Sequence, residues 1–359
     1  MKKIAIFCPY PLSQVPSQRF RFEQYLEWLR QNNFNITFLP LYGHSTWQFI
    51  NGNRNLIQRT VRIWASIALQ IFKVFKVTGK DFVLVHREIL PLGPPILEWT
   101  ISKIFRKKII YDFDDAIWLT DNNNESWLKK KLRWRGKVGW ICKWGHKVSV
   151  GNEYLARYAR QYNLHVVVNP TTIDTENLHN PKLCPQKNND NNVMIGWTGS
   201  HSTLKYLEKL QPVLKMIGER YKQASFLVIA DQPPALDLKG TVFVQWSKET
   251  EIEDLLKIDI GVMPLPDDAW ARGKCGFKIL QYMALGIPSI ASPVGANMEV
   301  IKHGKNGFLC TTEAEWLAAF DLLINNVNLR KEIGAEGRKT VTERYSVLSN
   351  ASNFLSLFE

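Results

Sequence analysis

A glycine-rich, cationic loop stands before a predicted helix in the second half of this 359-residue chain. It contains Arg272, Gly273, Lys274 and Gly276, and apolar spacing predicts the helix over residues 276–285. Glycines let a backbone approach a ligand closely, and the start of a helix offers N–H groups and a positive dipole end to an anion. The loop is therefore typical of a diphosphate site, although an ordinary loop–helix–strand unit with solvated cations would contain the same residues.

Two further groups extend this predicted anion site. Lys278 lies on the predicted helix after this loop, one helical turn before Gln281, and its part in the site depends on the family resemblance described below. Earlier in the chain, Gly199 and Ser200 precede another predicted helix and form a candidate phosphate cradle. A plain helix cap explains this second loop equally well.

Three carboxylates within four residues follow a predicted strand in the first half. They are Asp112, Asp114 and Asp115. Carboxylates this close repel each other unless they are solvated or paired, and one of them is a candidate to orient or deprotonate a substrate hydroxyl. A capping cluster before a helix is the alternative. The D-x-D spacing of Asp112 and Asp114 is a weak metal signal, and we expect no metal here.

Cationic residues follow two other predicted strands of the first half. Arg19 and Arg21 come after the first strand and are expected to bind an anionic group, with solvated cations at a helix start as the alternative. Arg87 and Glu88 come after the third strand, and we favour a structural ion pair between them.

The net charge of +13 lies entirely in the first half of the chain. Residues 1–180 contain 26 Lys/Arg and 13 Asp/Glu, whereas residues 181–359 contain 20 of each. This asymmetry predicts an anionic partner for the first half. Segments 56–77 and 127–144 interleave cations with tryptophan and aliphatic residues, as helices on an anionic membrane surface do. The alternative is that these tryptophans belong to the core.

Short apolar runs alternate with amphipathic segments along the whole chain, which predicts parallel β-α-β units. Strands are expected at 4–8, 35–41, 82–85, 108–111, 148–150, 166–168, 193–197, 225–230, 241–245, 260–263 and 288–291. Helices are expected at 19–31, 56–77, 203–221, 250–256 and 276–285. The pattern predicts an α/β protein of two Rossmann-like domains with parallel sheets facing a central cleft, where ligands bind outside the carboxyl ends of the strands.

A polar stretch at 179–192 interrupts this pattern and is predicted to be a linker. We expect a first domain over 1–180, a second over 181–335, and a C-terminal helix over 336–359 that packs back on the first domain. The five cysteines are scattered with no C-x-x-C pair, which favours a reducing cytoplasm. No apolar run is long enough to predict a signal peptide or a transmembrane helix.

Several of these motifs resemble glycosyltransferase family four, a retaining family of the GT-B fold. Residues 282–292, YMALGIPSIAS, are similar to the second half of the family's segment E-x7-E-A-M-A-x-G-x-P-V-V-A-S. The resemblance continues through Gly295, Glu299, Gly304, Gly307 and Phe308. Two earlier stretches, 168–174 and 195–200, resemble the family's entry to the second domain and its first glycine loop. The order of these motifs makes the resemblance specific over about 165–345.

One departure from the family pattern concerns its pair of glutamates, which hold the donor sugar and the nucleotide ribose. Gly273 and Gln281 stand at these two positions. The resemblance implies that Gln281 holds the ribose through its amide, and Asp267 or Asp268 is a candidate substitute for the first acid. Ser200 stands where the family usually has an arginine, so the phosphate role passes to the cations of the loop at 272–278.

The resemblance implies a glycosyltransferase that moves a sugar from a nucleotide-diphosphate sugar to a glycan, lipid-linked or polysaccharide-precursor acceptor, with retention. The implied donor residues are Gly199, Ser200, Arg272, Lys274, Lys278 and Gln281. The implied acceptor residues are Arg19, Arg21 and Asp112, and the catalytic candidates are Asp114, Asp115 and Asp268. We expect no cofactor, metal or nucleic-acid partner, and a cytoplasmic location with peripheral attachment to the inner face of the membrane. The alternatives are a GT-B sugar-nucleotide epimerase, or a non-catalytic sugar-nucleotide-binding protein of an assembly pathway, which the missing acid pair suggests.

Overall fold

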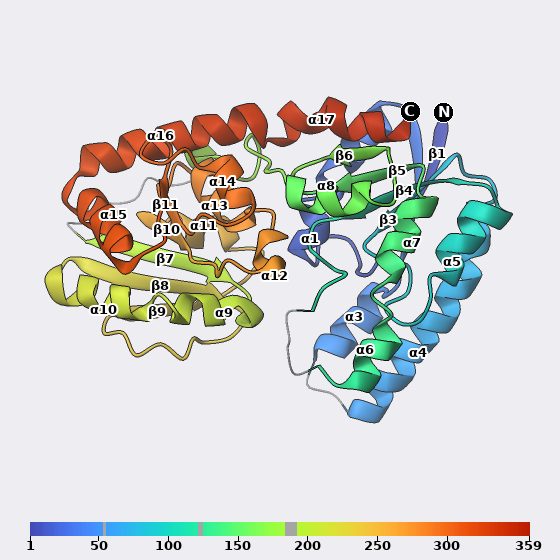
Figure 1. Ribbon diagram of the computed structural model, residues 1–359, viewed down its shortest axis with the longest axis horizontal. Helices are drawn as coiled ribbons and strands as arrows, with labels where there is room; N and C mark the ends of the chain where they lie inside the picture. The colour runs from blue at the N-terminus through green and yellow to red at the C-terminus, as the bar shows by residue number, and fades with distance from the viewer. Residues whose placement is uncertain (53–54, 121–124, 184–191) are drawn as a thin grey trace. The chain divides into compact units, whose positions relative to one another are not determined.

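The computed structural model describes residues 1–52, 55–120, 125–183 and 192–359, and its chain divides into two compact units. Unit 1 comprises Met1–Thr171 together with Ala351–Glu359, and unit 2 comprises Thr172–Asn350. Each unit is built on one parallel sheet of six strands with helices packed against it (Figure 1). The predicted α/β class with two Rossmann-like domains is confirmed.

The sheet of unit 1 has the strand order β2-β1-β3-β4-β5-β6, and every neighbouring pair is parallel. Its strands are β1 (Lys2–Cys8), β2 (Phe34–Pro40), β3 (Phe82–His86), β4 (Lys108–Phe113), β5 (Lys147–Val150) and β6 (Val166–Val168). The central strands are buried along nearly their whole length, as strands covered on both faces must be, and this explains their continuous apolar runs.

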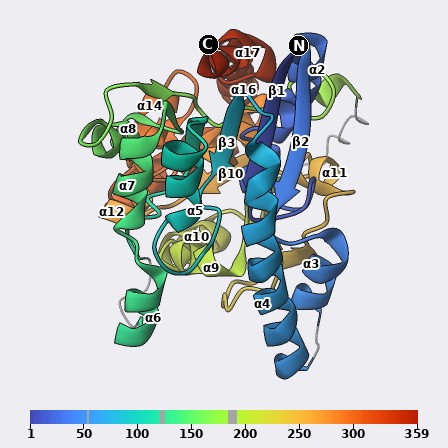
Figure 2. The same ribbon diagram turned by 90° about the vertical axis from the view of Figure 1, so that its right-hand side faces the viewer.

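The helices of unit 1 connect these strands. They are α1 (Pro16–Arg19), α2 (Leu26–Gln31), α3 (His44–Asn51), α4 (Leu56–Lys73), α5 (Ile96–Trp99), α6 (Trp127–Arg133), α7 (Lys137–Trp144) and α8 (Glu153–Arg160), with short turns η1 (Glu23–Tyr25), η2 (Val74–Val77) and η3 (Thr100–Ile104). Figure 2 looks onto the layer that contains α4, α5 and α7, with α6 below α7. The single helix predicted over 19–31 is wrong. Phe20, Arg21 and Phe22 are all buried, which no single helix face allows, and the chain breaks there.

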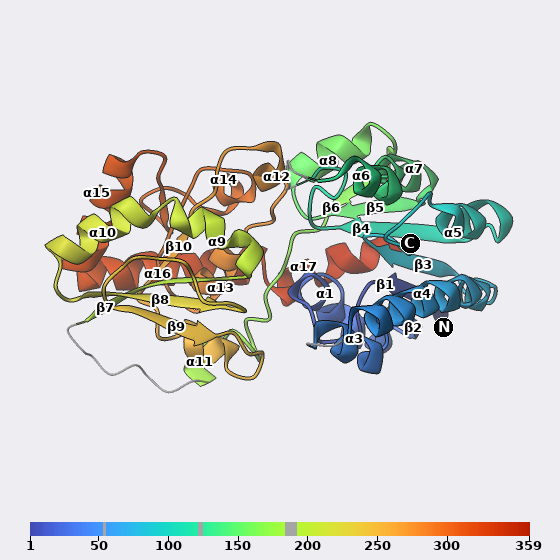
Figure 3. The same cartoon turned by 90° about the horizontal axis from the view of Figure 1, so that it is seen from below.

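Unit 2 has the strand order β12-β11-β10-β7-β8-β9 (Figure 3). Its strands are β7 (Val193–Gly199), β8 (Ala224–Ala230), β9 (Thr241–Gln245), β10 (Ile260–Met263), β11 (Ser289–Ala291) and β12 (Phe308–Leu309). Its helices are α9 (His201–Glu208), α10 (Gln211–Arg220), α11 (Glu251–Leu255), α12 (Ala269–Arg272), α13 (Phe277–Ala284), α14 (Ala296–Val300), α15 (Glu313–Asn325) and α16 (Val327–Arg344), and a short turn η4 (Pro181–Leu183) precedes β7. The helix predicted over 203–221 is two helices, because Pro212 lacks the N–H that an uninterrupted helix needs and stands in the first turn of α10.

The last helix, α17 (Val347–Leu355), and the turn η5 (Ser356–Phe358) carry the chain from unit 2 into unit 1. Within unit 1 the ring of Phe354 stacks on Tyr25 at a centroid distance of 4.3 Å, and the Asn353 amide donates to the carbonyl of Val168 at 3.1 Å. The chain first changes unit after Thr171, earlier than the predicted boundary at 180/181, and α16 belongs to unit 2. Of the predicted linker, residues 184–191 lie outside the described residues.

Close packing of α13 on α16 depends on a glycine. Gly334 of α16 lies against the backbone of Gly286, where a Cβ atom would come within 2.9 Å of the Gly286 carbonyl carbon. Three residues further on, a Cβ on Gly337 would meet the Met283 side chain at 3.2 Å. A backbone cannot yield as a flexible side chain can, so these two glycines differ in what they tolerate.

We therefore expect Gly334→Ala to lower the free energy of unfolding of unit 2 by about 1–3 kcal/mol through overpacking. Gly337→Ala is the matched control in the same helix. We expect it to be close to neutral, because the helix propensity gained by alanine is about 1 kcal/mol and offsets a small adjustment of Met283. Urea denaturation of both variants measures the difference, and equal stabilities would contradict this account of the packing.

Candidate functional site

The strand order of unit 2 reverses between β7 and β10, which are neighbours in the sheet. In open parallel sheets, ligands bind outside the carboxyl ends of the strands at such a reversal. The chain leaves β7 at Gly199 and leaves β10 at Met263, so the loops at 199–201 and 264–276 begin at this point. The structure thus brings together the two loops that the sequence indicated as phosphate sites.

The cations of the second loop already have partners. Arg272 forms a bidentate ion pair with Asp267, with Nε–Oδ1 at 2.6 Å and Nη2–Oδ2 at 2.9 Å, and both side chains are exposed. The Lys274 ammonium lies 5.6 Å from the centre of the Trp270 ring. Asp268 caps α12, since its Oδ1 accepts the Ala271 N–H at 2.7 Å. An anion that binds Arg272 must therefore compete with the carboxylate of Asp267.

Lys278 links the two loops directly. Its ammonium group lies 5.2 Å from the centre of the Trp197 ring, at the end of β7. A Cβ atom on Gly199 would come within 2.5 Å of the Trp197 ring and 2.8 Å of Lys278 Cε, so the packing of these two side chains favours glycine at position 199. Gly276 adopts a left-handed φ of 69° at the start of α13, where glycine is the residue with the least strain.

Gln281 is buried and has two polar partners that sequence reasoning missed. Its Nε2 lies 3.2 Å from Glu251 Oε1 and 3.3 Å from His179 Nε2. Glu251 also accepts from the indole N–H of Trp246 at 3.4 Å. The carboxylate that contacts Gln281 is therefore Glu251 of α11, whereas Asp267 and Asp268 are engaged by Arg272 and by the α12 cap. No local pattern indicates this contact, because Glu251 and Gln281 are thirty positions apart.

The start of α9 also differs from the sequence-based expectation. Ser200 makes no side-chain cap. Instead Asp231, at the carboxyl end of β8, accepts the His201 N–H at 2.5 Å and the His201 ring nitrogen Nδ1 lies 2.7 Å from its other oxygen. A carboxylate at the start of a helix interacts favourably with the helix dipole, so Asp231 supplies there the negative charge that the predicted cradle would take from a phosphate.

In unit 1 the strand order reverses between β1 and β3, and a buried ion pair lies beside this point. The Arg21 guanidinium binds the Asp112 carboxylate and the carbonyl of Asn169. Asp112 also accepts from Ser149 Oγ at 2.6 Å and contacts His86 Nδ1 at 2.8 Å. These side chains are all at most 4% exposed.

Burial raises the pKa of Asp112, but the charge of Arg21 and the hydrogen bond and charge of His86 outweigh it, and the pKa ends well below its usual range. The network accounts for both Arg21 and Asp112 without a ligand. Side chains that bind the acceptor must have exposed surface, and these two side chains lack it. The alternative that Arg21 is a solvated cation at a helix start is also excluded, because Arg21 is buried. Arg19 is also nearly buried, with its guanidinium 4.9 Å from the Phe20 ring.

A second, more exposed ion-pair group follows β3 and β4. Arg87 donates to Asp114 at 2.9 Å and to Asp115 at 2.8 Å, so the predicted cluster of carboxylates is paired. The favoured Arg87–Glu88 ion pair is wrong: Glu88 pairs instead with Lys137 at 2.8 Å. Arg87 has a left-handed φ of 64°, which directs it away from its neighbour in sequence and toward the end of β4.

Comparison with known proteins bears directly on unit 2. Residues 183–340 match the family model described as glycosyl transferases group 1. Unit 2 contains a group 1 glycosyl transferase domain. A curated relative, N-acetyl-alpha-D-glucosaminyl L-malate synthase of Bacillus anthracis, is 22% identical over 169 residues, which is 44% of this chain and 43% of that protein. The match thus spans less than half the length of that relative. The family resemblance stated from the motifs is confirmed at this level.

Solved structures of glycosyltransferases share the fold of the whole chain. Sucrose-phosphate synthase of Thermosynechococcus elongatus has a TM-score of 0.72 at 14% identity. The match covers 100% of this chain and 98% of the synthase chain. Anabaena HepE, solved in complex with UDP and glucose, has a TM-score of 0.66 at 14% identity over 99% of both chains. A glycosyltransferase of Rickettsia africae has a TM-score of 0.68 at 14% identity and covers 99% and 97%. These likenesses confirm the predicted GT-B fold.

The buried ion pair of unit 1 gives a stability prediction. Asp112→Asn removes the negative charge but leaves the Arg21 charge buried, so we expect it to lower the free energy of unfolding by about 3–5 kcal/mol. The matched control is Glu153→Gln in α8, whose exposed partner is Arg160. An exposed pair of this kind contributes at most about 1 kcal/mol. Urea denaturation, resolved to unit 1 by hydrogen exchange of β4, measures both.

The sign of the pH dependence follows from the depressed pKa of Asp112. Its contribution is fully present above the ordinary carboxyl pKa of about 4 and is lost as the pH falls through the lower pKa of the folded state. The wild-type protein should therefore lose stability more steeply below about pH 4 than Asp112→Asn. Parallel acid profiles for the two proteins would contradict the assignment.

Proposed function

We propose that the chain transfers a sugar from a nucleotide-diphosphate sugar to a glycan, lipid-linked or polysaccharide-precursor acceptor, with retention of the anomeric configuration. The observation that carries this proposal is the convergence of the loops at 199–201 and 264–276 at the strand reversal of the group 1 domain. The complex of Anabaena HepE with UDP-glucose, a protein of the same fold, supports a nucleotide sugar as donor.

In this proposal the donor binds unit 2. Lys278, next to Gly199, and Arg272 and Lys274 neutralise the diphosphate, whose growing charge as the leaving group is the main electrostatic demand of the transition state. Arg272 exchanges Asp267 for phosphate when the donor binds, which frees a carboxylate beside the site. Gln281 is as buried as Arg21 and Asp112, so in this proposal its amide positions Glu251 and does not bind the ribose directly. Gly199 and Ser200 contribute backbone to the phosphates, and Asp268 holds the loop by capping α12. No metal takes part.

In unit 1 the proposal assigns different roles to the residues that the sequence placed at the acceptor. Asp114 and Asp115 are half-buried rather than fully buried, and they remain the candidates to orient or deprotonate the acceptor hydroxyl, with Arg87 fixing both. Arg21 and Asp112 are positioning residues, because their buried ion pair holds the end of β4 that precedes Asp114 and Asp115. Arg19 remains the candidate for an anionic group of the acceptor.

Substitution of the loop cations tests the donor site. We expect Arg272→Ala and Lys274→Ala each to lower kcat/KM for sugar transfer by about 100-fold, since loss of one preorganised charge contact to a leaving group typically has this effect. Lys215→Ala is the control, because Lys215 is an exposed cation of α10 whose partner is Asp237. Transfer from radiolabelled UDP- and GDP-sugars is measured.

Full transfer activity in both variants would contradict the assignment of these cations. Interconversion of the sugar nucleotide without transfer would indicate an epimerase instead. Binding of the sugar nucleotide with neither reaction would indicate a non-catalytic binding protein.

We also propose that unit 1 works at an anionic membrane surface. Its helix α4 is apolar on the outside: Ser66 and Gln70 are its buried residues, whereas Leu69 and Phe72 are 60% and 70% exposed. Single exposed apolar residues are ordinary, but an exposed apolar stripe of this length indicates a contact surface. Segment 56–77 carries four cations and no acid. Among the described residues, no helix combines the length and apolar character needed to cross a membrane.

Flotation with vesicles tests this membrane contact. We expect the protein to float with phosphatidylglycerol vesicles and to be released as salt screens the cations. Leu69→Asp should reduce flotation at least several-fold. Leu322→Asp, at a leucine of unit 2 that is 51% exposed, should not. Flotation that depends on neither lipid charge nor salt would contradict the proposal.

A further inference from the structure

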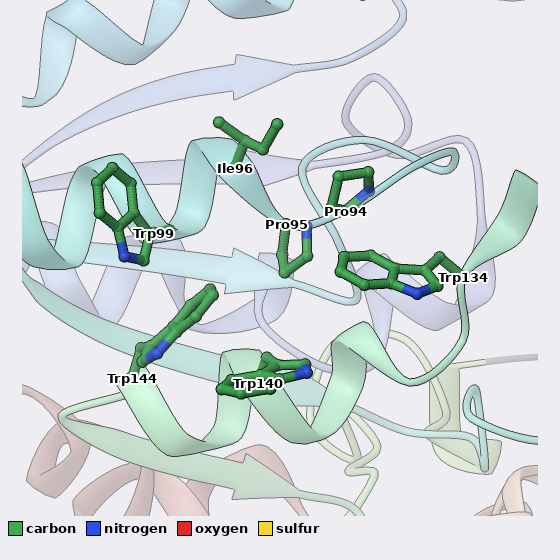
Figure 4. A pocket seen from close by; sticks show the side chains of 7 residues that line it. All are labelled: Pro94, Pro95, Ile96, Trp99, Trp134, Trp140 and Trp144. Carbon is green, nitrogen blue, oxygen red and sulfur yellow. The ribbon is translucent and has the colours of Figure 1, made fainter.

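A hollow lined entirely by apolar side chains opens on the same layer of unit 1 as α4. It has a volume of about 240 Å³. Figure 4 shows its lining, in which α5 and the turn before it face α7. The residues are Pro94, Pro95, Ile96, Trp99, Trp134, Trp140 and Trp144. A dry cavity of about 150 Å³ takes a benzene-sized apolar ligand, so this hollow has room for a longer hydrocarbon segment.

The tryptophans of this hollow are not core residues. Trp99, Trp134 and Trp140 are 42%, 44% and 48% exposed, and the interior side of α7 is filled by Val138 and Ile141 instead. Burial of the tryptophans in the core, the alternative considered for segment 127–144, is therefore wrong for Trp134 and Trp140. Contact with water is unfavourable for exposed indole rings around an apolar hollow, and an apolar group that covers them is favoured.

Trp134 reaches the hollow at a cost in backbone strain. It ends α6 with a left-handed φ of 44°, a conformation in which a bulky side chain is a genuine outlier and which glycine usually occupies. The loop on the other side is tied to the same helix end, because the Gly93 N–H donates to the carbonyl of Leu132 at 2.8 Å. This backbone hydrogen bond brings the end of α6 beside the turn at Pro94 and Pro95, which line the hollow together with Trp134. Strain of this kind persists where the surrounding structure requires that geometry.

The surroundings of the hollow are strongly cationic. Segment 127–144 contains seven Lys or Arg and no acid. Lys129, Lys130 and Lys131 are exposed on α6, and Lys143 lies 5.6 Å from the centre of the Trp140 ring. Among the described residues, Glu125 pairs with Arg135 and Glu88 with Lys137, which leaves the lysines of α6 and Lys143 as the cations that an anionic ligand could meet. An apolar hollow near exposed lysines complements a molecule with a hydrocarbon chain and an anionic head.

We propose that this hollow is a binding site for one acyl chain of an anionic phospholipid, which is drawn from the bilayer and anchors unit 1. The chain lies between Pro95 and Trp140, and the headgroup phosphate meets the lysines of α6. Trp99 and Trp134 close the sides of the hollow around it. The site extends the proposed membrane surface from a face that rests on lipid to a pocket that holds a single lipid.

The test uses monomeric lipid, so that it does not depend on the proposed membrane contact of α4. Lauroyl-lysophosphatidylglycerol below its critical micelle concentration is titrated into the full chain, and binding is followed by calorimetry. Ile96→Trp fills the hollow and adds apolar surface at its mouth, where Ile96 is 59% exposed. Leu322→Trp is the control, since it adds the same side chain at an exposed site of α15 in unit 2, where the leucine is 51% exposed.

We expect saturable binding of one lipid per chain by the wild type and by Leu322→Trp. Ile96→Trp should weaken it at least tenfold, because each methylene excluded from an apolar site costs about a factor of four. If the tryptophans act only as a general apolar surface, Ile96→Trp binds as well as the wild type or better, and the proposal is overturned. Binding of lauroyl-phosphocholine with equal affinity would overturn the role of the cations.

Two other occupants give different results. Concentration-dependent dimerisation that Ile96→Trp abolishes, without any lipid binding, would assign the hollow to a second copy of the chain and overturn the proposal. Tight binding of farnesyl phosphate with no binding of the lysolipid would assign it to an isoprenoid carrier and would likewise overturn it. Failure of vesicle flotation with intact lysolipid binding would count against the α4 surface and leave the hollow as proposed.

Discussion

Parallel strands connected by helices bring all their carboxyl ends to one edge of a sheet, and both units depend on this constraint. In each unit the order of the strands reverses once, between β1 and β3 and between β7 and β10, so the loops on the two sides of that point diverge and leave their polar groups exposed. The loop cations of unit 2 follow β10, a strand at its reversal, and the carboxylates of unit 1 follow β4, the neighbour of β3. The strand order of the two sheets therefore determines where the candidate functional groups lie.

Charged groups collected at such an edge must be neutralised, and the two units do this differently. In unit 1, Arg21 and Asp112 are buried against each other, which makes the pair costly to break and fixes the ends of neighbouring strands. In unit 2, Arg272 and Asp267 pair in the open, where water and salt weaken the interaction and where a phosphate can take the place of the carboxylate. The buried pair is suited to holding the strand ends in place, and the exposed pair is suited to exchanging its carboxylate for a ligand.

The outer layer of unit 1 reverses the usual distribution of side chains. Polar Ser66 and Gln70 face inward on α4, and apolar residues and indoles face outward on α4, α6 and α7. The positive charge of the chain is concentrated in the same half of the sequence. Hydrophobic attraction and electrostatic attraction thus act on the same layer, and a bilayer with anionic headgroups satisfies both.

The sequence by itself determined the α/β class, the positions of the predicted strands and the glycosyltransferase motifs, because hydrophobic period and glycine spacing are local properties of the chain. It could not find β12, which is only two residues long, or the break after Arg19. Only the tertiary structure decided the partners. Arg21 and Asp112 are 91 positions apart and Gln281 and Glu251 are 30 apart, so no local pattern records their contacts. Whether a charge is buried in a pair or exposed to a ligand depends on what surrounds it after folding, and that alone separates Arg21 from Arg272.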